Sequence, residues 1–149
     1  MARTTRGRKT LASLLSSRPI ALEPIALEPL QRLIEAGADV NKREGMYTPA
    51  YLAAKFGQAE ALKLLIEAGA DVNLADKDGR TPAYIASQNG QTEALKLLIE
   101  AGADVNLTSI SGSTPAYIAS HQGQTEALKL LIKAGADVNL ADRNLRFTP

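Results

Sequence analysis

A 33-residue internal repeat constrains this chain more than any other feature. The pair Thr-Pro occurs at residues 48–49, 81–82 and 114–115, so successive pairs lie 33 residues apart. Glycines keep the same step, and the stretches 81–107 and 114–140 differ at only three positions. Self-similarity at a fixed period of this length is typical of folds built from stacked copies of one small unit. The sequence therefore predicts an array of repeats.

Each unit has the pattern of two short helices. Thr81 followed by Pro82 is typical of a helix start, because the hydroxyl can accept from an unpaired backbone N–H and proline suits the first helical position. Gly90 ends the first helix, since glycine tolerates the positive φ found there. A second helix follows and ends at Gly102. Its apolar stripe consists of Ala94, Leu95, Leu98 and Ile99.

Neither helix is expected to be stable alone, because helices of about ten residues are marginal in water. Stacking the copies side by side buries their apolar stripes and makes the core between neighbouring units. Only 4% of residues are aromatic, and the apolar content is mostly Ala, Leu and Ile, which favours close-packed helices over a β-sandwich. We therefore expect an all-α, elongated and curved solenoid.

The motifs resemble one known family. The order T-P-x-x-x-A-x-x-x-G, a second helix ending L-L-I-x-A-G-A-D-V-N and a turn ending D-G-x-T-P are similar to ankyrin repeats over about residues 29–149. The resemblance implies helix–turn–helix units joined by β-hairpin-like turns, which bind through hairpin tips and the concave face of the first helices. The family pattern T-P-L-H is here T-P-A-Y. Its tyrosines must therefore satisfy their hydroxyl groups differently from the usual histidine, or point outward.

The repeats divide the chain into expected units. Residues 1–18 are a basic arm that can also contribute to the N-terminal cap, as Leu11–Ser17 has helical apolar spacing. The prolines at positions 19, 24 and 29 argue against one continuous helix between that segment and the next. The other units are a degenerate capping repeat at 19–41, ankyrin repeats at 42–73, 74–106 and 107–139, and the start of a truncated further repeat at 140–149.

The C-terminal end carries Thr148-Pro149, which is the opening pair of another repeat. We interpret this as a truncation that leaves apolar helix faces of the last full repeat uncovered. Such a face predicts fraying, a missing downstream repeat or association. The expected state is a monomer or a weak dimer through this end.

Charge and composition exclude several classes of function. The first 18 residues carry five basic and no acidic side chains, whereas the rest of the chain has 12 basic and 16 acidic ones, a net charge of −4. A nucleic acid could therefore bind only through the arm. No apolar run is long enough to span a membrane. The absence of cysteine excludes disulfides and thiol catalysis, and it suits an intracellular, reducing compartment, for which we expect the cytoplasm.

No catalytic, metal-binding or cofactor-binding constellation is present in the sequence. His121 is the only histidine and lacks an orienting acid and a nucleophile nearby in sequence. Asp76-Lys77-Asp78-Gly79 is similar to the start of a calcium loop, but the twelfth residue is Ser87 rather than Glu, so we interpret it as a turn. We expect neither enzymatic activity nor a cofactor.

Tyrosines form a column at one position of the repeat, with Tyr51, Tyr84 and Tyr117 in successive copies. The regular spacing favours packing over an aromatic recognition surface. Tyr47 differs, because it lies in a hairpin just before Thr48, where an exposed tyrosine is a candidate binding anchor.

Differences between the copies locate the candidate binding surface. The helix stripes are nearly identical, whereas substitutions gather in the hairpins and at the ends of the first helices. These positions carry few packing constraints and share one side of the molecule. We expect a protein-interaction module, and the alternative is a scaffold or targeting segment of a larger protein. The expected contact residues are Tyr47, Phe56, Lys77, Arg80, Gln88, Asn89, Ile110, Ser113, His121 and Gln122.

Overall fold

The computed structural model describes residues 10–16 and 27–141. These parts of the chain are all-α, with no β-sheet. None of their helices is long and apolar enough to cross a membrane. The eight helices are α1 (Leu11–Ser16), α2 (Leu27–Glu35), α3 (Pro49–Lys55), α4 (Ala59–Glu67), α5 (Pro82–Gln88), α6 (Thr92–Glu100), α7 (Pro115–His121) and α8 (Thr125–Lys133).

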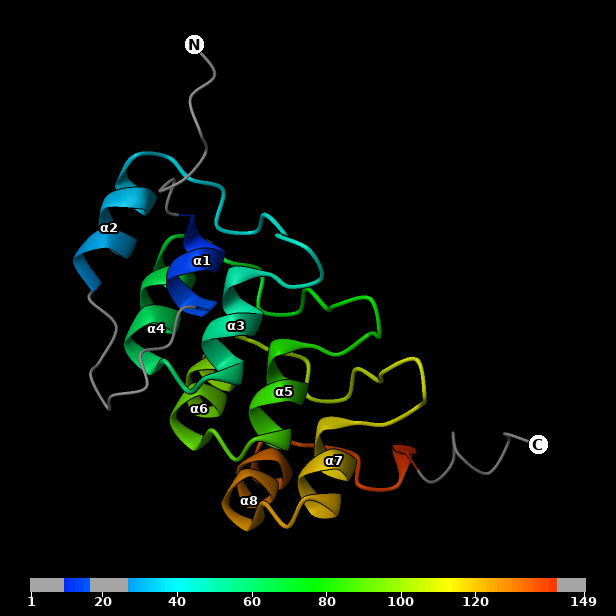
Figure 1. Cartoon of the computed structure of the whole chain (residues 1–149). Coiled ribbons are helices and arrows are strands. Elements are labelled where there is room, and N and C mark those ends of the chain that lie inside the picture. The colour runs from blue at the N-terminus through cyan, green and yellow to red at the C-terminus, as the bar shows by residue number, and fades with distance from the viewer. Residues whose placement is uncertain (1–9, 17–26, 142–149) are drawn as a thin grey trace.

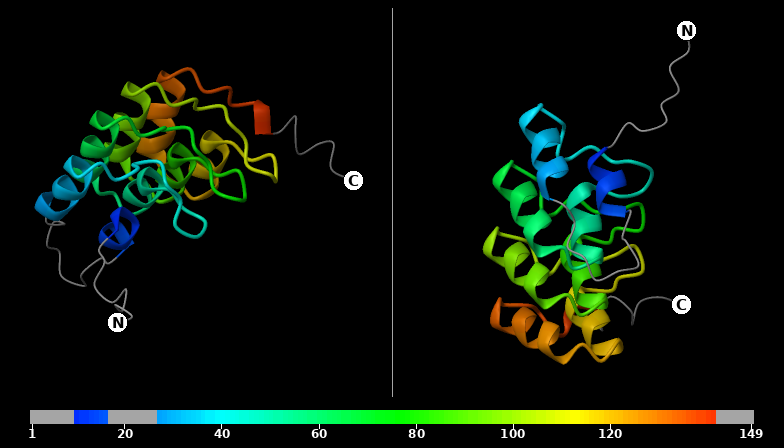
Figure 2. Two further views of the ribbon diagram at one scale, coloured as in Figure 1. Left: turned by 90° about the horizontal axis from the view of Figure 1, so that it is seen from above. Right: turned by 60° about the vertical axis from the view of Figure 1, so that its left-hand side comes forward.

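The helices form two parallel rows (Figure 1). The first row runs α1, α3, α5, α7 and the second runs α2, α4, α6, α8, each helix packing against its neighbours in the row and against its partner. The long connections between pairs project as hairpins from the side of the first row that faces away from the second (Figure 2). The expected solenoid of stacked helix pairs is therefore confirmed.

The Thr-Pro pairs begin the first helix of each full repeat, as the sequence predicts. The hydroxyl oxygens of Thr48, Thr81 and Thr114 accept from the backbone N–H three residues later, at 3.2, 3.1 and 3.1 Å. Proline occupies the first helical position in each case. The three threonines are buried. Each pair therefore fixes where the first helix begins and how the hairpin enters it.

The core lies between units rather than within one. Ala94, Leu95 and Leu98 of α6 are fully buried, as are their counterparts in α4, while Ile99 is only partly covered. The predicted stripe is thus confirmed for three of its four members. Neighbouring second helices supply much of the cover, because α6 packs against both α4 and α8.

A row of asparagines ties successive units together. The side-chain oxygens of Asn41, Asn73 and Asn106 accept from the backbone N–H of the aspartate in the next unit's GADVN segment, at 2.7, 2.8 and 2.8 Å. We call these three contacts the asparagine spine. Since the same bond recurs at each junction, the spine holds the units in one register.

The N-terminal pair covers the first full repeat. Leu11 and Leu15 of α1 and Leu30 of α2 are buried in the same core, with α1 against α3 and α2 against α4. The helix expected at Leu11–Ser17 is present over Leu11–Ser16. Helix α2 begins at Leu27, so Pro29 lies in its first turn, where the missing N–H has no helical partner. Pro19 and Pro24 lie outside the described residues.

Candidate functional site

Three hairpins form a continuous edge along the solenoid. Each closes through a backbone hydrogen bond: Glu44 N–H to Tyr47 C=O at 3.1 Å, Asp76 N–H to Arg80 C=O at 2.9 Å, and the equivalent bond from Ser109 to Ser113 at 2.9 Å. We call residues 42–47, 75–80 and 108–113 the hairpin edge.

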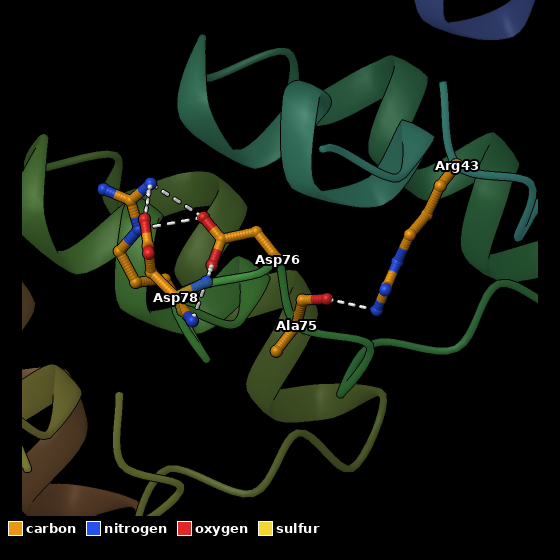
Figure 3. Close-up of polar contacts among 5 residues, drawn as sticks. Arg43, Ala75, Asp76 and Asp78 are labelled. Atoms are coloured by element: carbon orange, nitrogen blue, oxygen red, sulfur yellow. Dashed lines mark hydrogen bonds and ion pairs between the residues drawn. The ribbon is translucent and has the colours of Figure 1, made fainter. Parts of the chain in front are cut away.

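Neighbouring tips of the hairpin edge are bonded to one another. The backbone N–H of Ile110 donates to the carbonyl of Asp78 at 2.8 Å, and the Arg43 guanidinium donates to the carbonyl of Ala75 (Figure 3). Backbone groups at loop tips are usually left to water. Here the carbonyls of Ala75 and Asp78 accept hydrogen bonds from the neighbouring hairpins, and these two bonds join the three tips. The exposed side chains of the tips are therefore held on an ordered backbone.

A buried ion pair organises the middle hairpin (Figure 3). The Asp76 side chain has no exposed surface; one of its oxygens accepts from the backbone N–H of both Asp78 and Arg80, each at 2.9 Å. The other receives the Arg80 guanidinium at 2.8 Å, and Asp78 adds a second contact at 3.2 Å. Arg80 is therefore a structural element of the hairpin, and the expectation that its position is free of packing constraint is wrong.

The third hairpin replaces this ion pair with hydroxyl groups. Ser109 and Ser113 occupy the positions of Asp76 and Arg80, one repeat later, and both are buried. Their hydroxyls are linked through Ser111 at 2.9 and 3.3 Å, and Ser109 also accepts from the backbone N–H of Ser113 at 3.2 Å. Ser113, one of the contact residues expected from the sequence, is therefore covered within its own hairpin.

The tyrosine column connects each repeat to the next hairpin. Tyr51 lies beside Asp76 and Arg80, and Tyr84 lies beside Ser109 and Ser113. Tyr51 and Tyr84 are buried, so packing is confirmed for both, whereas Tyr117 in the last copy is exposed. The phenol groups of Tyr51 and Tyr84 thus lie beside polar side chains of the following repeat.

Burial raises the pKa of both internal tyrosines above the usual value of 10.0. Below pH 10 the folded and unfolded chains both keep these phenol protons. Above pH 10 the unfolded chain releases these protons while the folded chain still retains them, so stability falls as the pH rises, by ~1.4 kcal/mol per pH unit for Tyr51. We expect urea unfolding between pH 8 and 11 to show this loss, and Tyr51→Phe to reduce its slope. Equal slopes in both proteins would contradict the assignment.

The first helices present three parallel stripes beside the hairpin edge. Each stripe uses positions four residues apart; the last two lie on one face of the first helix, and the first precedes that helix. Each begins just before the Thr-Pro pair, passes through the tyrosine and ends at the last residue of the helix. The stripes are Tyr47, Tyr51 and Lys55; Arg80, Tyr84 and Gln88; and Ser113, Tyr117 and His121. Together they make what we call the first-helix face.

The first stripe is aromatic and cationic. The rings of Tyr47 and Tyr51 stack with centroids 4.8 Å apart, and the Lys55 ammonium lies 5.4 Å from the ring centroids of both Tyr47 and Phe56. Such cation–π contacts orient the ammonium group. Lys55 did not emerge from the sequence as a contact residue, although it occupies the variable position matched by Gln88 and His121.

The other expected contact residues spread over the edge and the face. Lys77, Ile110, His121 and Gln122 are exposed, and Ile110 at the third tip is 77% exposed. Gln88 is half-buried. Asn89 is exposed, but its amide donates to the carbonyl of Lys55 at 3.0 Å, so it also joins two repeats. The His121 ring lies 6.1 Å from that of Tyr117, which the sequence analysis assigned to packing.

The described residues include no group of three His, Cys, Asp or Glu side chains that could share a metal ion. The carboxylates that suggested a weak calcium motif, Asp76 and Asp78, are engaged by Arg80 and by backbone N–H groups. Their arrangement is that of a hydrogen-bonded turn.

The fold and the exposed edge define a class of helical-repeat protein with a long, irregular surface along one side. A family model described as ankyrin repeats in three copies matches residues 26–109 and residues 51–142. The chain therefore belongs to the ankyrin-repeat family. Ankyrin repeats are generally protein–protein interaction modules, and the family is typically non-enzymatic. No curated protein matches the chain.

Proposed function

We propose that this chain binds a partner protein across the hairpin edge and the first-helix face. The observation that carries the proposal is the exposed Ile110 at the tip of the third hairpin, whose backbone is bonded to the second. A large apolar side chain held in water on an ordered backbone is a feature of interface anchors, since little conformational entropy is lost on binding.

The contact set follows from the contacts within the chain. Arg80 and Ser113 are held inside their own hairpins, and the Asn89 amide donates to a carbonyl of the preceding repeat. Substituting any of the three would therefore change the shape of the site as well as its chemistry. The remaining side chains are the better contacts. Lys77, Ile110, His121 and Gln122 are exposed, and Tyr47, Lys55 and Phe56 are half-buried.

These side chains favour a mixed partner surface. Apolar and aromatic groups lie beside cationic ones, with Lys55 near Tyr47 and Phe56 at one end. Along the edge, Lys77 directly precedes Asp78, whose carbonyl accepts from the Ile110 N–H. A partner segment with apolar side chains and carboxylates would be complementary to both.

The test begins with affinity capture by the intact chain and identification of the bound protein by mass spectrometry. Binding of that partner is then measured by calorimetry for Lys77→Ala/Ile110→Asp/His121→Ala. We expect a loss of affinity of at least tenfold, because hot-spot contacts carry most of the binding energy, and an unchanged melting temperature. The matched control is Lys63→Ala/Glu67→Ala/Lys129→Ala, which alters exposed residues of the second-helix row. Retained affinity in the first variant, or an equal loss in the control, would refute the site.

The single histidine is best placed for binding. His121, the single histidine, has a tyrosine ring as its aromatic neighbour. A general base needs an orienting partner and a group to deprotonate. We infer that His121 acts as a contact residue.

A further inference from the structure

The end face of α7 and α8 exposes positions that are covered in every earlier repeat. Val72 and Val105 are 7% and 6% exposed, whereas the equivalent Val138 is 56% exposed. Tyr51 and Tyr84 are 1% and 7% exposed, against 39% for Tyr117. Ile66 and Ile99 pack against the core, but Ile132 is 52% exposed. At both internal junctions the following repeat covers these positions.

The polar elements of the same junctions also recur on this face. A Cβ atom on Gly57 would lie 2.2 Å from the amide oxygen of Gln91, and one on Gly90 would lie 2.3 Å from that of Gln124. Each glycine therefore leaves the space that a glutamine of the next repeat fills, and we call this space the glutamine seat. Gly123, the third in the series, has nothing within 4 Å of its Cβ position.

The glutamines that occupy these seats make a defined contact. The amide of Gln91 donates to the carbonyl of Lys55 at 3.3 Å, and that of Gln124 donates to the carbonyl of Gln88 at 3.2 Å. Both glutamines stand immediately before the second helix of their repeat. A unit that fits the seat at Gly123 therefore needs glutamine at that position.

The asparagine spine also stops at this face. Asn139 is exposed and follows Asn41, Asn73 and Asn106 in the series, and within the described chain no N–H donates to its side chain. An aspartate N–H of the kind found in the GADVN segment is its matched donor.

We propose that this face, formed by Tyr117, Gly123, Ile132, Val138 and Asn139, is a docking surface for one further ankyrin repeat, stacked in the same register as α7 and α8 stack on α5 and α6. This face continues the two internal interfaces, where the complementary surface of the next repeat is seen in full. A second copy of the chain offers a different surface at its other end, because the outer side of α2 exposes Glu28, Gln31 and Arg32.

The test adds the proposed occupant to the intact chain. A copy of residues 109–141, which are 33 residues, is inserted after Ala141 so that the repeat period is preserved. We expect the melting temperature to rise by at least about 5 °C, because the inserted unit covers the half-exposed apolar side chains. A 33-residue Gly/Ser insertion at the same point is the matched control and should produce no rise.

A substitution at the spine reports whether docking is in register. Asn139→Ala should leave the melting temperature of the natural chain unchanged within about 1 °C and lower that of the extended chain by about 2 to 4 °C, as loss of the internal hydrogen bond requires. Ile132→Ser should show the same contrast. Equal shifts in the two chains, or no gain from the inserted repeat, would overturn the proposal. So would a doubled mass by light scattering in the chain without the insertion, because the occupant would then be a second copy.

Discussion

Replacing Leu98 with alanine is expected to lower the free energy of unfolding by about 3 kcal/mol. Leu98 is fully buried on α6, which packs against the second helices of both neighbours. The substitution removes apolar contacts and leaves a cavity that short helices fixed by two neighbours can close only in part. The loss should be measurable by urea denaturation, with the fraction folded followed by circular dichroism.

The end face supplies the control for this prediction. Ile132→Ala removes a comparable volume from α8, but Ile132 is 52% exposed and has less cover to lose. We expect a cost of less than about 1 kcal/mol. If Ile132→Ala destabilised the chain as much as Leu98→Ala, the core would not lie between units as described.

Arg80→Ser is expected to cost about 2 to 3 kcal/mol, although Arg80 looks like an ordinary hairpin residue. Its guanidinium is the cation bonded to Asp76, whose side chain has no exposed surface. Without it, the buried carboxylate loses its cationic partner and keeps the backbone N–H donors of Asp78 and residue 80. We place the cost below that of a fully buried pair, because the Arg80 side chain is 28% exposed and water can reach it.

The chain itself offers the matched control. The third hairpin has Ser109 and Ser113 at the positions of Asp76 and Arg80. Asp76→Ser/Arg80→Ser should therefore be more stable than Arg80→Ser alone, since it removes the uncompensated carboxylate and introduces hydroxyls that the fold already accommodates one repeat later. Costs that simply add in the double variant would show that the ion pair does not organise the hairpin.

Periodicity was sufficient to predict the elements and most of the core. The Thr-Pro pairs determine where the first helices begin, and the stripe around Leu95 and Leu98 determines which face the second helix buries. Both signals are local, since they depend on capping chemistry and on apolar spacing within one helix. The packing of Tyr51 and Tyr84 also followed from their regular spacing.

The candidate site was harder to predict, because variation between copies was interpreted as freedom from constraint. Arg80 and Ser113 differ, yet each is tied to a partner four residues earlier, Asp76 and Ser109 respectively. The two positions change together from one hairpin to the next, and that paired change was the available signal. Lys55 was missed for another reason: its significance depends on the rings of Tyr47 and Phe56, whose relative placement periodicity does not give.

The asparagine spine has a consequence for how such a surface can diversify. From each asparagine to the next Thr-Pro threonine the chain takes seven steps after Asn41, eight after Asn73 and eight after Asn106. The spine and the threonine caps are fixed at either end of this interval. Length and sequence can therefore change in the intervening loop while the pitch of the helices is preserved, within the limits set by the hydrogen bonds that join neighbouring tips.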